Sequence, residues 1–196
     1  MVSGVKQKHG KGCRKLAVLH EAIAPMDRLV PKWADLAPRR ALLAILVVAA
    51  LAGCSGREPA PRFSYTLLDG ARASSDSLRG KVVLVNFWAT SCAACVEEMP
   101  QIVATHRKFQ ARGFETLAVA MRYDAPASVS LFAQAMQLPF GVVIDNTGAI
   151  AKAFPGVQVT PTTFVIDKQG AIVKRIVGAP DFRELHLLVG KLLTET

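Results

Sequence analysis

Residues 81–89, KVVLVNFWA, form an almost unbroken apolar run that is rich in β-branched side chains. A strand with one solvated face would alternate apolar and polar residues, and this run does not. The run therefore predicts a strand buried at the centre of a sheet. Two cysteines, Cys92 and Cys95, follow it almost at once and are separated by two alanines.

Helical and strand patterns alternate along the rest of the chain and end in a hairpin. Helices are expected at residues 92–112, 126–138, 148–154 and 181–193, and further strands at 62–68, 114–121, 140–146 and on both sides of a turn at 168–170. The β-α-β portion implies parallel pairing, and the hairpin implies antiparallel strands. We therefore expect an α/β fold with a mixed central β-sheet and helices on both faces.

A cysteine pair at this spacing can be a redox disulfide, half of a metal site or a structural staple. Here the pair lies where the predicted strand ends and a helix begins. Unpaired N–H groups and the helix dipole would stabilise a thiolate on Cys92, and Cys95, one turn further on, would be more shielded. We therefore predict that Cys92 is the nucleophile and Cys95 the resolving thiol of a redox-active disulfide, with no other cofactor.

A metal site would need more ligands than this pair, because a structural zinc site uses four. His106 and His186 fall inside expected helices, where a histidine is usually a surface or packing residue. No metal ligand is predicted.

The net charge of +9 is concentrated at the front of the chain. Residues 1–40 carry nine of the 24 Lys and Arg side chains but only three of the 15 Asp and Glu side chains. A basic stripe across the folded body is therefore not supported, and nucleic-acid binding is not predicted.

Arg39 and Arg40 precede an uncharged stretch, ALLAILVVAALAG, at residues 41–53. It is shorter than the roughly 20 residues of a spanning helix and is typical of the core of a secretory signal. Its end, LAGC, resembles the lipobox of bacterial lipoproteins, which implies that Cys54 is lipidated and begins the mature chain. Acyl chains would then anchor the protein to a membrane. A plain cleaved signal or a short uncleaved anchor is the alternative.

Three regions are therefore expected along the chain. Residues 1–53 are a leader with a lipoprotein signal, of which residues 1–25 would come from a misplaced start if translation begins at Met26. Residues 54–62 are the lipidated Cys54 and a polar tether that contains glycine and two prolines. Residues 63–196 are expected to form the folded domain.

The cysteine pair between strand and helix resembles thioredoxin, and VTPTTFVID, with Pro161 before a strand, strengthens the resemblance. A more specific resemblance is to the TlpA/ResA-like group of membrane-tethered thioredoxin-like proteins. It rests on GKVVLVNFWAT, EEMP and TPTTFVID-KQG, and it covers residues 62–193. The resemblance implies a thioredoxin-like fold in which Pro161 is a cis proline that faces the cysteines, with Thr160 close to the sulfurs.

The same resemblance implies a thiol-disulfide oxidoreductase that is lipid-anchored in the cell envelope and faces the periplasm. Members of this group usually reduce disulfides in partner proteins, for example in cytochrome c maturation. The expected partners are therefore protein thiols and disulfides and a membrane electron donor, such as a DsbD/CcdA-type protein.

The resemblance also bears on how the proton of Cys95 is handled. Thioredoxin has a buried aspartate where this chain has Asn86, which does not titrate. The TlpA/ResA-like group instead has a glutamate three residues after the second cysteine, and Glu98 occupies that place. A partly buried carboxylate there would have a raised pKa and could carry a proton, whereas the alternative is a solvated side chain. Trp88 is expected to pack beneath the cysteines.

Some features leave the direction of electron flow and the function open. Ser91 stands where the group usually has tryptophan, and the two-alanine spacer adds no charge. A peroxiredoxin-like thiol peroxidase would need a PxxxTxxC pattern, whereas Thr90 stands two residues before Cys92. A copper-binding module of this fold would have three residues between its cysteines, and a non-catalytic module would not need both cysteines and Pro161.

Overall fold

The computed structural model describes residues 56–195. The predicted leader at residues 1–53 and the predicted lipid site at Cys54 lie outside the described residues. Within residues 56–195, no helix combines the length and the apolar character needed to cross a membrane.

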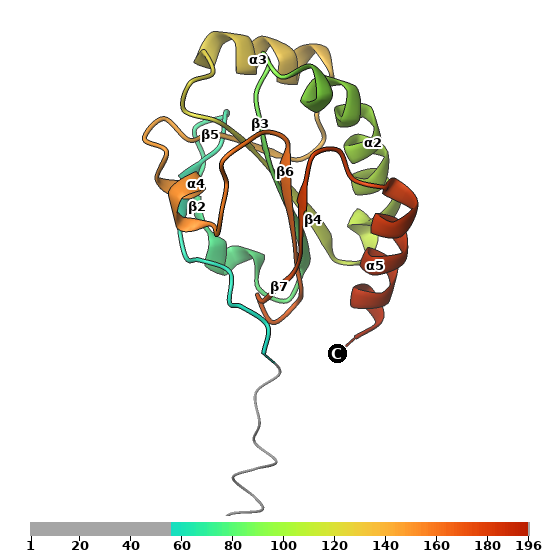
Figure 1. Ribbon diagram of the computed structural model, residues 1–196. Helices are drawn as coiled ribbons and strands as arrows, with labels where there is room; N and C mark the ends of the chain where they lie inside the picture. The colour runs from blue at the N-terminus through green and yellow to red at the C-terminus, as the bar shows by residue number, and fades with distance from the viewer. Residues whose placement is uncertain (1–55, 196) are drawn as a thin grey trace, which may run out of the picture. The chain divides into compact units, whose positions relative to one another are not determined.

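A five-stranded mixed sheet forms the centre of the domain (Figure 1). Its strands, in the spatial order β5-β4-β3-β6-β7, are Gly141–Ile144, Phe114–Ala120, Val82–Trp88, Thr162–Ile166 and Ile172–Val177. β3, β4 and β5 pair in parallel, whereas β6 pairs antiparallel with β3 and with β7. The predicted mixed sheet is confirmed, and the apolar run at residues 81–89 supplies its central strand.

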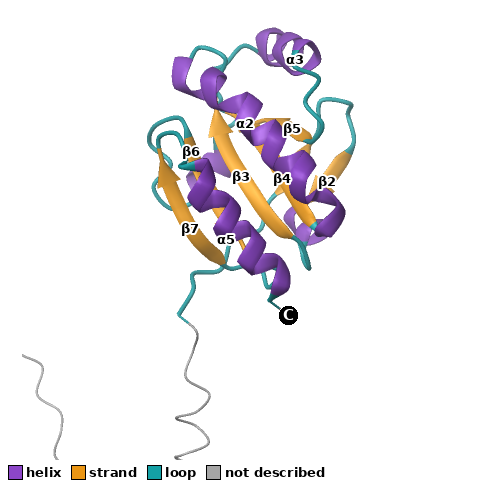
Figure 2. Ribbon diagram, turned by 90° about the vertical axis from the view of Figure 1, so that its right-hand side faces the viewer, coloured by secondary structure: helices purple, strands orange, loops and turns teal. Residues whose placement is uncertain are grey.

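Helices cover both faces of this sheet, as predicted. The helices α2, α3, α4 and α5 are Ala93–Phe109, Pro126–Ala135, Ala149–Ala153 and Phe182–Thr194, and two short 3-10 helices, η1 and η2, are Ser75–Leu78 and Gln110–Arg112. Figure 2 shows α2 and α5 lying across one face. The opposite face is covered by α4 and by a hairpin of β1 and β2, which are Ser64–Thr66 and Arg72–Ser74.

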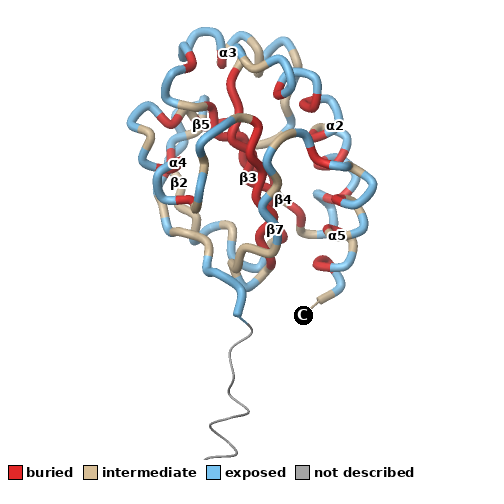
Figure 3. Tube along the Cα trace, viewed as in Figure 1, coloured by how far each residue is buried: buried red, intermediate tan, exposed pale blue. Residues whose placement is uncertain are grey.

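All seven residues of β3 are buried, and Figure 3 shows the red of buried residues at the centre of the domain, where β3 lies. Leu84 and Trp88 belong to the apolar cluster that also contains residues of α2 and α5. Val83, Val85 and Phe87 belong to the cluster on the α4 side. Because alternate side chains of β3 enter different halves of the core, the strand is fixed from both faces.

Most of the predicted elements are confirmed, with boundaries that differ by a few residues. Gly113 ends the long helical region with a φ of 90°, a conformation that favours glycine. Asp181 caps α5 by accepting hydrogen bonds from two backbone amides. β2 and η1 were not predicted. The three residues of β2 are exposed or half-buried and show no apolar alternation. It becomes a strand only through its pairing with β1.

Residues 57–62, expected as part of a tether, pack against the domain instead. The Ile172 amide donates to the Glu58 carbonyl oxygen at 2.7 Å, and the Ala60 amide donates to the Gly170 carbonyl oxygen at 2.9 Å. The segment thus forms a short antiparallel pairing beside the start of β7. The packed domain therefore begins before residue 63, because these backbone groups find partners that the Gly- and Pro-containing sequence does not reveal.

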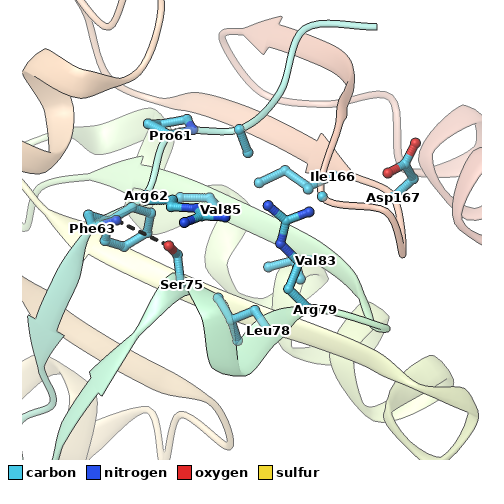
Figure 4. A pocket seen from close by; sticks show the side chains of 12 residues that line it. Pro61, Arg62, Phe63, Ser75, Leu78, Arg79, Val83, Val85, Ile166 and Asp167 are labelled. Carbon is cyan, nitrogen blue, oxygen red and sulfur yellow. Dashed lines mark hydrogen bonds between the residues drawn. The ribbon is translucent and has the colours of Figure 1, made fainter. Parts of the chain in front are cut away.

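A small cavity of about 30 Å³ lies between this segment and the sheet (Figure 4). Phe63 and Leu78 line it, together with Val83, Val85 and Ile166 from β3 and β6. Val83 and Ile166 pair near the start of β3, whereas the cysteines follow its other end. The cavity is therefore remote from the cysteine pair, and it is too small to hold a substrate.

Asp167→Ala should destabilise the protein and loosen this segment. The Asp167 side chain is 4% exposed and accepts hydrogen bonds from Arg57 at 3.2 Å and from the Ala171 amide at 2.8 Å. Removing the carboxylate leaves the Arg57 guanidinium and the Ala171 amide without their acceptor. The free energy of unfolding, measured by urea denaturation, should therefore fall by about 2 kcal/mol. Trypsin should also cut faster after Arg57, because its guanidinium is released.

Asp69→Ala is the matched control, since Asp69 accepts one hydrogen bond from a backbone amide in an exposed turn. Its loss of stability should be well below that of Asp167→Ala. Equal losses in the two variants would contradict a special contribution of the buried carboxylate.

Candidate active site

Three loops meet at one end of the sheet. Trp88, the last residue of β3, pairs with Ala120, the last residue of β4, and Phe87 pairs with Thr162, the first residue of β6. The loop after β3 carries the cysteines, the loop after β4 leads to α3, and the loop before β6 carries Pro161. The register of the strands therefore brings Cys92 and Pro161 to the same edge of the sheet.

The two cysteines occupy unequal positions at the start of α2. Cys92 is the N-cap residue, and the Cys95 amide donates to its sulfur at 3.2 Å. A disulfide joins the two residues, whose Cα atoms are 5.2 Å apart. Cys92 is half-buried, whereas Cys95 is completely buried. The helix start stabilises negative charge, so the accessible sulfur is also the one best placed to be a thiolate.

The peptide bond between Thr160 and Pro161 is cis, as the resemblance implied. The Pro161 carbonyl oxygen accepts a hydrogen bond from the Gly178 amide at 2.9 Å. The Thr162 hydroxyl donates to the Val159 carbonyl oxygen at 2.7 Å. These bonds hold the loop on both sides of Pro161, which is itself buried and has no N–H to donate.

Glu98 is buried beneath this edge and does not lie on the solvated side of its helix. Its side chain is 3% exposed, whereas the neighbouring Glu97 is exposed. Asn86 of β3 donates through Nδ2 to Glu98 Oε1 at 2.9 Å and to Thr163 Oγ1 at 3.0 Å. One neutral amide therefore connects the helix carboxyl to β6.

Burial raises the pKa of Glu98 to about 7, and the hydrogen bond from Asn86 opposes part of this rise. Glu98 Oε2, Asn86 Oδ1 and Trp88 Nε1 are buried and have no hydrogen-bond partner among the described residues. Since the Asn86 amide occupies Oε1, Oε2 is the oxygen that is open to carry a proton. A carboxyl group in this state can exchange protons near neutral pH.

Trp88 lies where it was expected, at the end of β3 and fully buried. Its ring packs against Phe132 of α3, with the ring centroids 5.1 Å apart. It belongs to the same apolar cluster as Cys95, so it supports the floor of the site.

Two contacts of this edge were missed by sequence reasoning. The Asp124 carboxylate accepts hydrogen bonds from Thr90, and the Tyr123 hydroxyl lies 3.2 Å from the Thr160 hydroxyl. Both residues come from the loop after β4, where no periodic pattern marks a role. Their position directly after a buried parallel strand is the only signal that could have identified them.

The two histidines of the domain contribute to packing. His106 Nδ1 lies 3.2 Å from Thr116 Oγ1, and His186 Nε2 lies 2.9 Å from Thr105 Oγ1. Among residues 56–195, no group of three His, Cys, Asp or Glu side chains is arranged to hold a metal ion.

Glu98→Gln should change how stability depends on pH. The carboxyl group keeps its proton up to about pH 7 in the folded protein, against about 4.5 as the ordinary value. Between these values the folded state binds more protons than the unfolded state, so stability falls as the pH rises. The fall due to Glu98 is at most about 3 kcal/mol, and it should be absent in Glu98→Gln when urea unfolding is followed from pH 4 to 8.

Glu97→Gln serves as the control, because Glu97 is an exposed neighbour on the same helix. Its stability profile should follow that of the wild type. Parallel profiles for the wild type and Glu98→Gln would show that Glu98 does not titrate in this range.

Comparison with known proteins agrees with this geometry. The sequence matches the AhpC/TSA family over residues 57–175. The thiol-disulfide oxidoreductase ResA of Bacillus thuringiensis subsp. konkukian is 34% identical over 137 residues, which cover 70% of this chain and 78% of that protein. ResA of Geobacillus thermodenitrificans is 39% identical over 119 residues, which cover 61% of this chain and 67% of that protein.

Solved structures show the same likeness. A thiol:disulfide interchange protein of the thioredoxin family from Chlorobium tepidum superposes with a TM-score of 0.66 at 31% identity, covering 72% of this chain and 99% of that one. A candidate thioredoxin from Neisseria meningitidis gives a TM-score of 0.66 at 40% identity, covering 71% of this chain and 93% of that one. The chain therefore belongs to the AhpC/TSA family and is a thioredoxin-like thiol-disulfide oxidoreductase of the ResA type.

Proposed function

We propose that this protein is a lipid-anchored, periplasm-facing enzyme that reduces disulfides in partner proteins. The observation that carries the proposal is the unequal cysteine pair, with accessible Cys92 and buried Cys95, at the sheet edge that also carries cis Pro161. Thiol-disulfide oxidoreduction is the activity that the names of the ResA relatives state. The direction of electron flow, the residue roles and the anchoring are parts of the proposal.

The reaction begins from the reduced protein. The Cys92 thiolate attacks one sulfur of a partner disulfide, a bond forms between these two sulfurs, and the partner's own S–S bond breaks. The released partner thiolate takes up a proton. Cys95 then loses its proton and attacks the Cys92 sulfur, so that the second partner sulfur leaves as a thiolate and is protonated. Two electrons have passed to the partner, and the Cys92–Cys95 disulfide of the structure is the product.

Glu98 is the proposed acceptor of the Cys95 proton. Cys95 is completely buried, so its proton needs an acceptor within the protein. Glu98 lies one helical turn further along α2, and its Oε2 has no hydrogen-bond partner among the described residues. With a pKa raised to about 7 by burial, the carboxylate can take up this proton and release it again near neutral pH. Asn86 keeps the carboxyl group in place through Oε1.

Thr160 and Pro161 are the proposed contact to the partner's backbone in the mixed disulfide. Pro161 has no N–H, so a partner strand that approaches this loop meets no donor at that position. The loop is already held by the hydrogen bonds on both sides of Pro161. A rigid loop costs little conformational entropy when a partner binds.

Repeated turnover requires that the Cys92–Cys95 disulfide is reduced again, for which we infer a membrane electron donor of the DsbD/CcdA type. Apocytochromes c are an inferred class of substrate, on the basis of the resemblance to the TlpA/ResA-like group. The lipid on Cys54 is inferred from the LAGC motif at the end of the apolar stretch. Such an anchor would keep the enzyme near its donor.

Cys95→Ala should trap partner proteins. Without a resolving thiol, the disulfide between Cys92 and the partner persists, so reducible adducts should appear on non-reducing gels of cell-envelope extracts. Cys92→Ala is the matched control and should give none. Adducts of equal yield from the two variants would contradict the roles proposed for the two thiols.

The reduction potential of the Cys92–Cys95 pair tests the direction of electron flow. A value near that of thioredoxin, about −270 mV, would support a reductant, whereas a value near that of DsbA, about −120 mV, would overturn this part of the proposal.

Glu98→Gln should remove a pH-dependent step from the exchange. In the wild type, the rate at which Cys95 resolves a preformed mixed disulfide should rise through about pH 7, as Glu98 becomes able to accept a proton. Stopped-flow measurements between pH 5.5 and 8.5, the window about that pKa, should show this rise in the wild type and in Glu97→Gln. The same inflection in Glu98→Gln would assign it to another group.

A further inference from the structure

Two adjacent residues of the loop after β4 contact the two loops that carry the proposed reactive groups. Asp124 is 7% exposed, and its carboxylate oxygens accept hydrogen bonds from the Thr90 amide and the Thr90 hydroxyl, both at 2.6 Å. Thr90 stands two residues before Cys92. Asp124 therefore ties its own loop to the backbone that leads into the cysteine pair.

Tyr123 reaches the other loop. Its hydroxyl lies 3.2 Å from the Thr160 hydroxyl, directly before cis Pro161, while the residue as a whole is 61% exposed. The hydroxyl group of Tyr123 therefore contacts Thr160, and the neighbouring Asp124 is held by its hydrogen bonds to Thr90. The aromatic ring of Tyr123 remains exposed to solvent. An aromatic side chain held in this way offers contact area at little cost in conformational entropy.

The aromatic ring lies at the same end of the sheet as Cys92 and Pro161. The loops after β3 and β4 and the loop before β6 meet at the end of β3, because Trp88 pairs with Ala120 and Phe87 pairs with Thr162. Tyr123 belongs to the third loop of this edge and touches Thr160. Val159, the residue before Thr160, is also exposed and apolar. A chain joined to Cys92 and lying along Pro161 therefore has Tyr123 and Val159 beside it.

We propose that Tyr123 is a specificity-determining residue that binds an apolar side chain next to the target cysteine of a partner protein. The inference rests on the proposed function, because it concerns the partner in the mixed disulfide. Ser91, on the cysteine side of the same edge, is small and polar, so Tyr123 supplies the aromatic surface that Ser91 lacks. A small disulfide such as 2-hydroxyethyl disulfide has no side chain beside its sulfur to make this contact.

Peptide disulfides test this inference directly. Two symmetric peptide disulfides are used as substrates. In each, two identical copies of a short peptide with one cysteine are joined by a disulfide bond. The two substrates differ only in the residue before the cysteine, which is leucine in one and serine in the other. The second-order rate constant for their reaction with the reduced full-length protein is measured, together with that for 2-hydroxyethyl disulfide. Tyr123→Ala, Tyr123→Phe and Leu187→Ala are compared with the wild type. Leu187 is 71% exposed on α5 and serves as the matched control.

We expect the wild type to react about five- to tenfold faster with the leucine dimer than with the serine dimer. Tyr123→Ala should lose this preference, and its reaction with the leucine dimer should slow more than its reaction with 2-hydroxyethyl disulfide. Tyr123→Phe should keep most of the preference, because the ring remains, and Leu187→Ala should keep all of it. Circular dichroism should show the fold unchanged in each variant.

An unchanged leucine preference in Tyr123→Ala would overturn the inference and leave the proposed function intact. Equal slowing with all three disulfides would also overturn it, because Tyr123 would then act on the cysteine loop and not on the partner. A wild type that reacts with none of the disulfides would overturn the proposed function, and this inference with it.

Discussion

The burial of β3 on both faces decides where the reactive groups of this protein lie. Its seven residues are all buried, and their side chains alternate between two separate apolar clusters. A strand fixed in this way cannot slip by one residue, because a slip would exchange the two sets of side chains between the faces. The carboxyl end of β3 is therefore held rigidly. It positions the cysteine pair, the loop after β4 and the loop that contains cis Pro161.

The buried carboxyl group of Glu98 lowers the stability of the fold when it is ionised, and in its proposed role it would transfer protons. Burial favours the neutral form of Glu98, and the single amide of Asn86 compensates for only part of the lost hydration. In thioredoxin, the comparable titratable group lies on the strand. In this chain the strand residue is the neutral Asn86, and the carboxyl group comes from the helix that carries the cysteines. The group moves with that helix, so its distance along α2 from Cys95 is set by helix geometry.

Local patterns explain how much of the fold and the site could be predicted from the sequence. A buried strand followed by a cysteine pair and a helix identified the central strand and the position of Cys92 at the start of the helix, whereas Glu98 was singled out by the resemblance to the TlpA/ResA-like group. Pro161 was located by a resemblance carried in a few adjacent residues. The contacts of Thr90 with Asp124 and of Tyr123 with Thr160 were not predictable in this way. They join residues 34 and 37 positions apart through single side chains, which leave no periodicity in the sequence. The packing of residues 57–62 was missed because it depends on backbone groups, which every sequence has.

The position of residues 57–62 bears on the distance between the proposed lipid anchor and the disulfide. They pack beside the β6–β7 turn, at the end of the sheet away from the cysteine pair. Three residues from Cys54 to Arg57 reach at most about 10 Å, and a strand as long as β3 spans about 20 Å. A lipid on Cys54, as proposed, would keep the base of the domain within about 10 Å of the bilayer surface. The reactive disulfide follows the other end of β3, so the length of that strand would separate it from the anchored base.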